Sequence, residues 1–131
     1  MPAFAGCSKA DKAESTASAE PAAAKVPTVT VDQADSIFAS QGQAVDANAA
    51  PTRKSMGVIP GAVLLTDSDS YKLTELPGDK SKPLVFYCAN TACGASHHAA
   101  DKAIAAGYSN VKVMPEGIAG WVKAGKKTAQ I

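Results

Sequence analysis

The chain has 131 residues, a formal net charge of +1 at pH 7, 46% hydrophobic residues and 19% charged residues. This length and composition predict one domain with its own core, and the near-neutral charge gives no reason to expect a nucleic acid or a charged membrane surface as a partner. No stretch approaches the roughly 18 uninterrupted apolar residues of a membrane-spanning helix.

The N-terminal 25 residues differ in composition from the rest of the chain. They are rich in Ala, Ser, Lys and Glu, so we expect residues 1–25 to be a disordered tether before a domain over residues 26–131. The segment Ala3–Ser8 resembles a truncated lipobox of bacterial lipoproteins, which implies an exported, periplasmic or cell-envelope protein held at the membrane only through a lipid on Cys7. A chance cysteine in a disordered tail is the alternative.

The first half of the domain is expected to alternate short strands with short helices. Asp32 is placed to cap the first helix and Gly42 to end it. In chain order, the pattern predicts a short strand or lead-in at Val29–Val31, a helix over residues 33–40, a strand at Gln43–Ala47, a polar loop at Asn48–Met56, a strand entered through Ile59–Leu65, and a short helix at Tyr71–Leu76.

The second half is built around the segment 82–107. Leu84–Tyr87 is an apolar run typical of a buried strand, and Ser96 is placed to cap a helix with Ala100, Ala103 and Ile104 on its buried face. A further strand at Asn110–Met114 and a last helix at Ile118–Ala124 follow. This alternation predicts an α/β layered fold with a mainly parallel sheet, in which ligands bind at the carboxyl ends of the strands.

Cys88 ends the central strand and faces the start of the next helix. A helix N-terminus lowers the pKa of a cysteine thiol, and the thiolate is the reactive form. We therefore interpret Cys88 as a nucleophile, although a small buried hydrophobe at a strand end is the structural alternative. The residues expected to form a loop that binds substrate or an anion around it are Ala89, Asn90, Thr91, Ala92, Gly94, Ala95 and Ser96.

Five blocks of the sequence carry a family resemblance, and in chain order they are Asp46, Gly57–Ala62, Tyr87–Cys88, Gly107–Val111 and Gly117–Trp121. Together they resemble the signature blocks of the rhodanese-like sulfurtransferases. The resemblance covers about residues 26–127 and implies a three-layer fold, with a central, mainly parallel five-stranded sheet flanked by helices. It also implies that Cys88 carries sulfur as a persulfide between a small sulfur donor and a thiol or cyanide-like acceptor, without a cofactor.

The sequence departs from the family pattern at three positions. Asn48 stands where many members have an arginine, and Val58 stands where a histidine is common. Ala95 stands where an arginine often precedes the helix, so the bidentate grip of a guanidinium on thiosulfate is lost. Loop amides and the helix N-terminus remain available for a single charge or a persulfide.

Cys93 lies in the same loop as Cys88, five positions further along. A curled loop can bring two such cysteines within disulfide distance, and Cys93 would then resolve a persulfide or a sulfenate on Cys88. This pairing suits the oxidising compartment that the lipobox implies. Alternatively, Cys93 only fills the wall of the loop.

His97, His98 and Asp46 are possible auxiliary residues. The two histidines lie in the first turn of the expected helix, where they are placed to move protons or to remain exposed to solvent. Their spacing from Cys88 and Cys93 departs from common zinc sites, so no metal is expected. We expect a monomer that is a sulfurtransferase. The alternatives are a thiol–disulfide redox protein that uses Cys88 and Cys93, and a non-catalytic rhodanese-like module that binds a partner or acts as a sensor.

Overall fold

The computed structural model describes residues 26–91 and 94–131. The expected tether with Cys7, and the loop residues Ala92 and Cys93, therefore lie outside the described residues. The elements are α1 (Val31–Ala39), β3 (Gln43–Asp46), α2 (Ala50–Met56), β4 (Val63–Leu64), the 3-10 helix η2 (Leu73–Glu75), β5 (Leu84–Tyr87), α3 (Ala95–Ala105), β6 (Val111–Met114) and α4 (Gly117–Lys123). None of these helices is long and apolar enough to cross a lipid bilayer.

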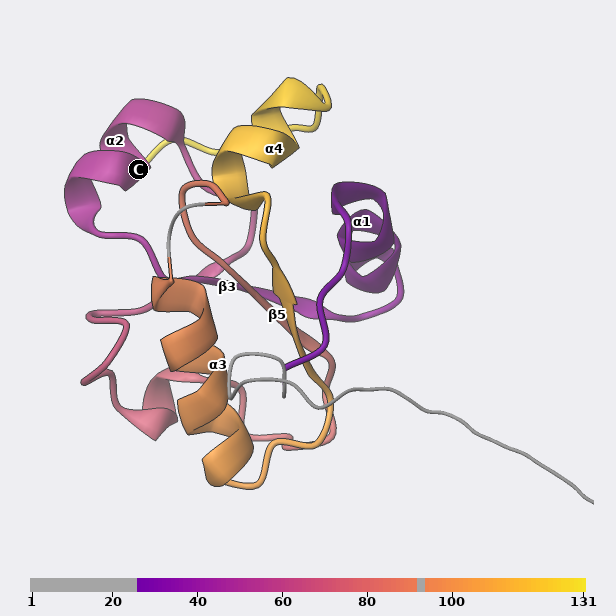
Figure 1. The fold of residues 1–131 in the computed structure, drawn as a ribbon, viewed down its shortest axis with the longest axis vertical. Coiled ribbons are helices and arrows are strands. Elements are labelled where there is room, and N and C mark those ends of the chain that lie inside the picture. The colour runs from indigo at the N-terminus through magenta and orange to yellow at the C-terminus, as the bar shows by residue number, and fades with distance from the viewer. Residues whose placement is uncertain (1–25, 92–93) are drawn as a thin grey trace, which may run out of the picture.

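The strands form one parallel sheet in the order β4-β3-β5-β6 (Figure 1). The predicted α/β class with a parallel sheet is confirmed, but the described residues contain four strands where five were expected. Val29–Val31 is a lead-in and not a strand, because the bridge between Thr28 and Val113 lies just before it and α1 already begins at Val31.

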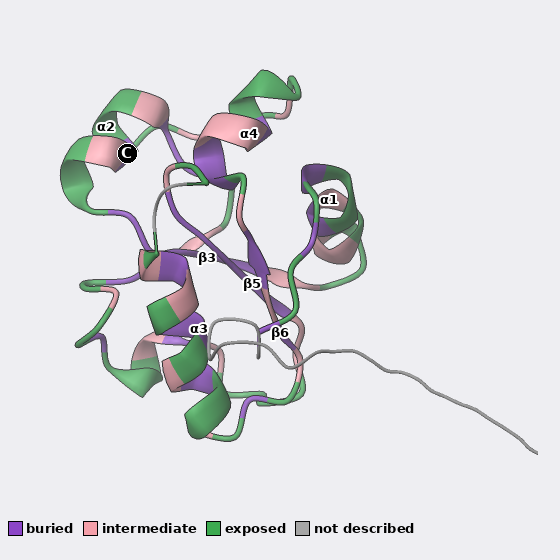
Figure 2. Ribbon diagram, in the orientation of Figure 1, coloured by how far each residue is buried: buried purple, intermediate pink, exposed green. Residues whose placement is uncertain are grey.

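Helices cover both faces of the sheet and bury most residues of β3, β5 and β6, whereas β4 is more exposed (Figure 2). Successive side chains of a strand point to opposite faces. Leu84 and Phe86 of β5 therefore pack in one cluster with Ala99 and Ala103 of α3. Val85 and Tyr87 pack in the other cluster, which the apolar sides of α1 and α4 complete with Val31, Ala34, Ile118 and Trp121.

Two helices in the first half differ from the prediction. Thr30, not Asp32, caps α1, because its side chain accepts from the Gln33 N–H at 3.1 Å while the Gln33 side chain accepts from the Thr30 N–H at 2.9 Å. The segment predicted as a polar loop contains α2, whose first turn holds Pro51. Its polar composition concealed a helix that buries Arg53.

The helix after the central strand also begins differently from the prediction. Gly94 is its N-cap, and Ser96 lies buried inside the first turn, 2% exposed, without capping the helix. Ile104, expected on the buried face, is exposed, because Ala99, Ala100 and Ala103 are the residues of α3 that face the sheet. The short helix expected at Tyr71–Leu76 is limited to the 3-10 turn η2.

Candidate active site at the end of strand β5

Cys88 directly follows β5 at the carboxyl edge of the sheet. Its side chain is 2% exposed, and its sulfur is disulfide-bonded. Cys7 and Cys93, the other cysteines of the chain, both lie outside the described residues, so pairing of Cys88 with Cys93 stays a prediction. The nucleophile predicted from sequence is thus an oxidised cysteine at the position where parallel sheets bind ligands.

The start of α4 holds the backbone of Cys88 in place, and Figure 1 shows this end of the helix beside the end of β5. The N–H of Ile118 donates to the Cys88 carbonyl, and the N–H of Ala119 donates to the Ala89 carbonyl, both at 2.9 Å. Gly117 has φ +64°, and a Cβ on it would lie 2.5 Å from the Cys88 carbonyl oxygen. The close approach therefore requires glycine at this position.

A buried polar network lies beside Cys88. Asp46, the last residue of β3, is 0% exposed, and its Oδ1 accepts from the N–H of Asn48 at 2.7 Å and from Nε of Arg53 at 3.1 Å. Its Oδ2 accepts from the Tyr87 hydroxyl at 2.7 Å, and the Tyr87 oxygen accepts from the N–H of Ile59 at 3.0 Å. Asp46, considered as an auxiliary catalytic residue, thus has both carboxylate oxygens engaged with protein donors.

Arg53 joins the carboxyl ends of two strands. Its Nη2 atom donates to the carbonyl of Asp46 at 3.0 Å and to the carbonyl of Leu65, just after β4, at 2.8 Å. Burial and then the nearby Asp46 carboxylate raise the pKa of Tyr87 well above its ordinary value, so its phenol remains a proton donor. Arg53 and Tyr87 therefore link the ends of β3, β4 and β5 around the candidate nucleophile.

Replacing Tyr87 by phenylalanine is expected to lower the free energy of unfolding by about 1–3 kcal/mol. The change removes the donor to Asp46 and the acceptor of the Ile59 N–H, and both of these groups are buried. Urea denaturation measures the effect. Tyr71→Phe is the matched control, because the Tyr71 hydroxyl only donates to the carbonyl of Ala99. Equal stabilities of the two variants would contradict the role of the network.

The two histidines in the first turn of α3 differ in their surroundings. Both backbone N–H groups donate to the Gly94 carbonyl, at 3.1 Å for His97 and 3.2 Å for His98. The His98 side chain is exposed, and its Nδ1 lies 3.8 Å from an Asp69 carboxylate oxygen. The His97 side chain is partly buried, and its Nδ1 atom is buried without a hydrogen-bond partner. Of the two, His97 is therefore the one with an unmet polar group near the loop.

Of the described residues of the predicted binding loop, Ser96 is buried and the others lie at least partly at the surface. Ala89 and Ala95 are partly exposed, whereas Asn90, Thr91 and Gly94 are exposed. The N-terminal turn of α3 contains no acidic residue, so its dipole is not offset there by a carboxylate. In residues 26–91 and 94–131, no group of three or more His, Cys, Asp or Glu side chains is arranged to hold a metal ion.

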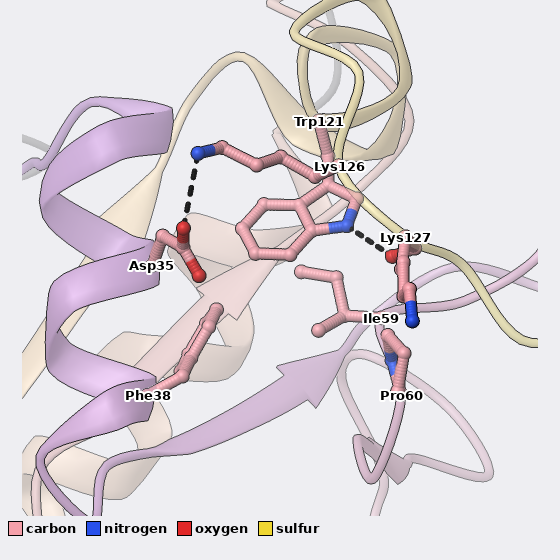
Figure 3. Close-up of a pocket in the computed structure, with 7 residues that line it drawn as sticks. All are labelled: Asp35, Phe38, Ile59, Pro60, Trp121, Lys126 and Lys127. Carbon is pink, nitrogen blue, oxygen red and sulfur yellow. Dashed lines mark hydrogen bonds and ion pairs between the residues drawn. The ribbon is translucent and has the colours of Figure 1, made fainter.

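A separate cavity of about 370 Å³ lies between α1 and the chain after α4. Figure 3 shows Phe38, Trp121, Ile59 and Pro60 around it. The ring centres of Phe38 and Trp121 lie 5.7 Å apart. An ion pair between Lys126 and Asp35 spans one side at 3.0 Å. Cys88 and the described loop residues are not part of its lining, so this cavity is not where a reaction at Cys88 would occur.

Comparison with known proteins identifies the family. The rhodanese-like domain model matches residues 30–124. Comparison with the curated proteins gives no match. The chain belongs to the rhodanese-like domain family, as the sequence blocks predicted.

Solved structures support the same fold. A rhodanese-like domain from Anabaena sp. is 20% identical, with a TM-score of 0.62 over 80% of each chain. A protein of unknown function and possible tyrosine phosphatase from Rhodopseudomonas palustris is 24% identical, with a TM-score of 0.62 over 82% of this chain and 87% of that one. The 3-mercaptopyruvate sulfotransferase SseA of Escherichia coli is 21% identical, with a TM-score of 0.58, over 81% of this chain and 52% of its own.

Sequence reasoning missed Arg53 as part of this region. The sequence showed only that the arginine common at position 48 is absent, whereas α2 supplies a cationic partner for Asp46 from Arg53, seven residues after it. A helical signal was present in the order Pro51, Arg53 and Gly57, a helix start followed by a positive-φ glycine at its end. No local pattern indicated that the side chain of Arg53 turns inward.

Proposed function

We propose that this rhodanese-like domain is a sulfurtransferase that moves sulfane sulfur through a persulfide on Cys88. The observation that carries the proposal is the position of Cys88: a buried sulfur at the carboxyl end of β5, with its backbone held by α4 and partly exposed loop residues beside it. The family includes sulfurtransferases, and the Escherichia coli neighbour SseA is a 3-mercaptopyruvate sulfotransferase.

Loading of Cys88 requires its free thiolate. The thiolate attacks the outer sulfur of a donor R–S–S⁻, the S–S bond of the donor breaks, and R–S⁻ leaves with the bonding electron pair. A thiolate acceptor then takes the outer sulfur from the Cys88 persulfide in the same manner. Because Cys88 is disulfide-bonded in this structure, a thiol reductant must first supply two electrons to open that bond.

The disulfide favours a thiol–disulfide redox function as the second candidate. A Cys93 thiolate that attacked the inner sulfur of a Cys88 persulfide would form a Cys88–Cys93 disulfide and release hydrosulfide. The same two thiols would equally exchange electrons with an external dithiol without any sulfur transfer. The oxidised state of Cys88 is the observation that supports this function.

Intact mass measurement tests the proposal on the full chain. Fully reduced protein is freed of reductant and incubated with thiosulfate, with an organic persulfide or with a thiosulfonate. We expect the gain of one sulfur atom from at least one donor, reversed by dithiothreitol and absent in Cys88→Ser. Cys7→Ser is the matched control, because it makes the same substitution outside the described domain and should gain sulfur normally.

The outcomes separate the candidate functions. A fully reduced protein that gains no sulfur from any donor contradicts the sulfurtransferase proposal. Sulfur gain that persists in Cys88→Ser places the carrier at another residue and also contradicts it. The redox candidate is supported instead if the wild-type protein gains no sulfur but loses two hydrogen atoms on mild oxidation, the mass change of disulfide formation. The Cys93→Ser variant should then show no such loss.

A further inference from the structure

Two buried side-chain atoms at the Cys88 end of the sheet have no hydrogen-bond partner. They are Nδ2 of Asn48 and Nδ1 of His97, and no other buried side-chain nitrogen or oxygen of the described residues lacks a partner. Leaving such a group unsatisfied destabilises the folded protein, so an unpartnered buried group needs an explanation. A role in binding a ligand is one explanation.

Both atoms belong to residues that flank the Cys88 loop. Strands β3 and β5 are parallel, and the N–H of Ala47 donates to the Tyr87 carbonyl at 2.9 Å. Asn48, which comes after Ala47, and Cys88, which comes after Tyr87, therefore both leave the sheet at its carboxyl edge. Asn48 is only 9% exposed, and its own N–H is fixed by Asp46. His97 lies on the other side of the loop, in the first turn of α3.

The donors at this place carry little net positive charge. Arg53 is the only arginine in the sequence, and it is engaged with Asp46 and with two carbonyl oxygens. Residue 95, just before Ser96, is alanine. An amide, an imidazole and a helix N-terminus suit a ligand with one negative charge better than one with two.

We infer that Asn48 and His97 bind the oxygen atoms of a singly charged sulfur donor, a thiosulfonate R–SO₂–S⁻. Asn48 donates from Nδ2, and His97 donates from Nδ1 in the tautomer that carries its proton there. An organic persulfide has no oxygen beside the transferred sulfur and leaves both groups unsatisfied, and thiosulfate brings a second charge. This inference rests on the proposed sulfurtransferase function.

The transfer step balances in atoms and charge. The Cys88 thiolate attacks the terminal sulfur of R–SO₂–S⁻, and the bond between the two sulfur atoms breaks. The sulfinate R–SO₂⁻ leaves with the electron pair, and Cys88 becomes the persulfide Cys88–S–S⁻. Negative charge grows on the sulfonyl oxygens as the sulfinate leaves, so donors held against these oxygens stabilise the transition state more than the bound substrate.

Binding is tested first without any sulfur transfer. Benzenesulfinate carries the same oxygens but no transferable sulfur, and Cys88→Ser cannot react. In the reduced Cys88→Ser protein, we expect benzenesulfinate to shift the side-chain amide resonances of Asn48, assigned through their loss in Asn48→Asp. The amide resonances of Asn110, at the opposite edge of the sheet, should remain unchanged.

Kinetics test the selection of the donor. We expect kcat/KM of the reduced wild-type chain to be higher with benzenethiosulfonate than with thiosulfate. Asn48→Asp replaces a donor by a negative acceptor, so kcat/KM with benzenethiosulfonate should fall by about ten- to a hundredfold, the loss of a hydrogen bond to a charged group. His97→Phe should lower it as well, and Asn110→Asp, the same exchange away from the site, should leave it unchanged.

The outcomes distinguish this inference from the proposed function. If benzenesulfinate shifts the Asn48 amide but no donor loads Cys88, the anion site stands and sulfur transfer is wrong. If donors load Cys88 but Asn48→Asp keeps the wild-type kcat/KM, the inference is wrong. This is the result expected if a buried water, and not the donor, accepts the hydrogen bond from Asn48 Nδ2. Equal or better use of thiosulfate, or an Asn48 amide that benzenesulfinate does not shift, also overturns it.

Discussion

Replacing Arg53 by methionine is expected to lower the free energy of unfolding by about 3–5 kcal/mol, as for other buried ion pairs that lose one partner. The change leaves the carboxylate of Asp46 buried without its cation, and it removes the donor to the carbonyls of Asp46 and Leu65. Urea denaturation followed by circular dichroism measures the loss, and a variant that is unfolded in buffer meets the same expectation.

Two further variants make this result specific to the ion pair. Lys54→Met is the matched control, because Lys54 is the adjacent basic residue of α2 and is exposed. It should change stability by less than about 0.5 kcal/mol. In Asp46→Asn combined with Arg53→Met both charges are absent, so part of the loss should be recovered. An Arg53→Met protein as stable as Lys54→Met would refute the structural role of the pair.

Replacing Gly117 by alanine is expected to slow sulfur loading of Cys88 by more than about a hundredfold, the effect of displacing a reacting group by about 1 Å. The new Cβ would lie 2.5 Å from the Cys88 carbonyl oxygen and 2.7 Å from the Ala89 carbonyl carbon. Both are backbone atoms, so α4 or the start of the loop must move. The rate of mass gain with a loading donor measures the effect.

Gly125→Ala separates this steric effect from backbone strain. Gly125 also has a positive φ, +81°, but a Cβ on it would meet no atom within 4 Å. It should therefore lose only about 1–2 kcal/mol of stability through the left-handed backbone and keep the wild-type loading rate. If Gly117→Ala loads sulfur as fast as Gly125→Ala, α4 does not position Cys88.

Local patterns predicted the central region well. The apolar run Leu84–Tyr87 is a buried strand, and a helix follows it from Ala95. These elements depend on residues close in sequence, namely side-chain periodicity and turn residues. The sequence blocks also predicted the family, which the match over residues 30–124 confirms. Ile104 was misplaced, because Ala99, Ala100 and Ala103 form the face of α3 that packs in the core and leave Ile104 exposed.

Long-range contacts explain what the sequence did not predict. The polar segment 48–56 has a composition typical of a loop, but packing of Arg53 against Asp46 stabilises α2 there. Likewise, the loss of an arginine at position 48 indicated a missing charge, whereas the fold supplies one from α2. Local propensity contains no information about a partner that only tertiary folding brings close.

By itself, the sequence determined the α/β class, the family and the position of Cys88 between a strand and a helix. Only the tertiary structure decided the surroundings of that cysteine. These are the close approach of Gly117 to its carbonyl, the network of Asp46, Arg53 and Tyr87, and the unpartnered amide of Asn48. The physical reason is that parallel pairing of β3 with β5 brings Asp46 beside Tyr87 across 41 positions of sequence. No periodicity in the chain records such a contact.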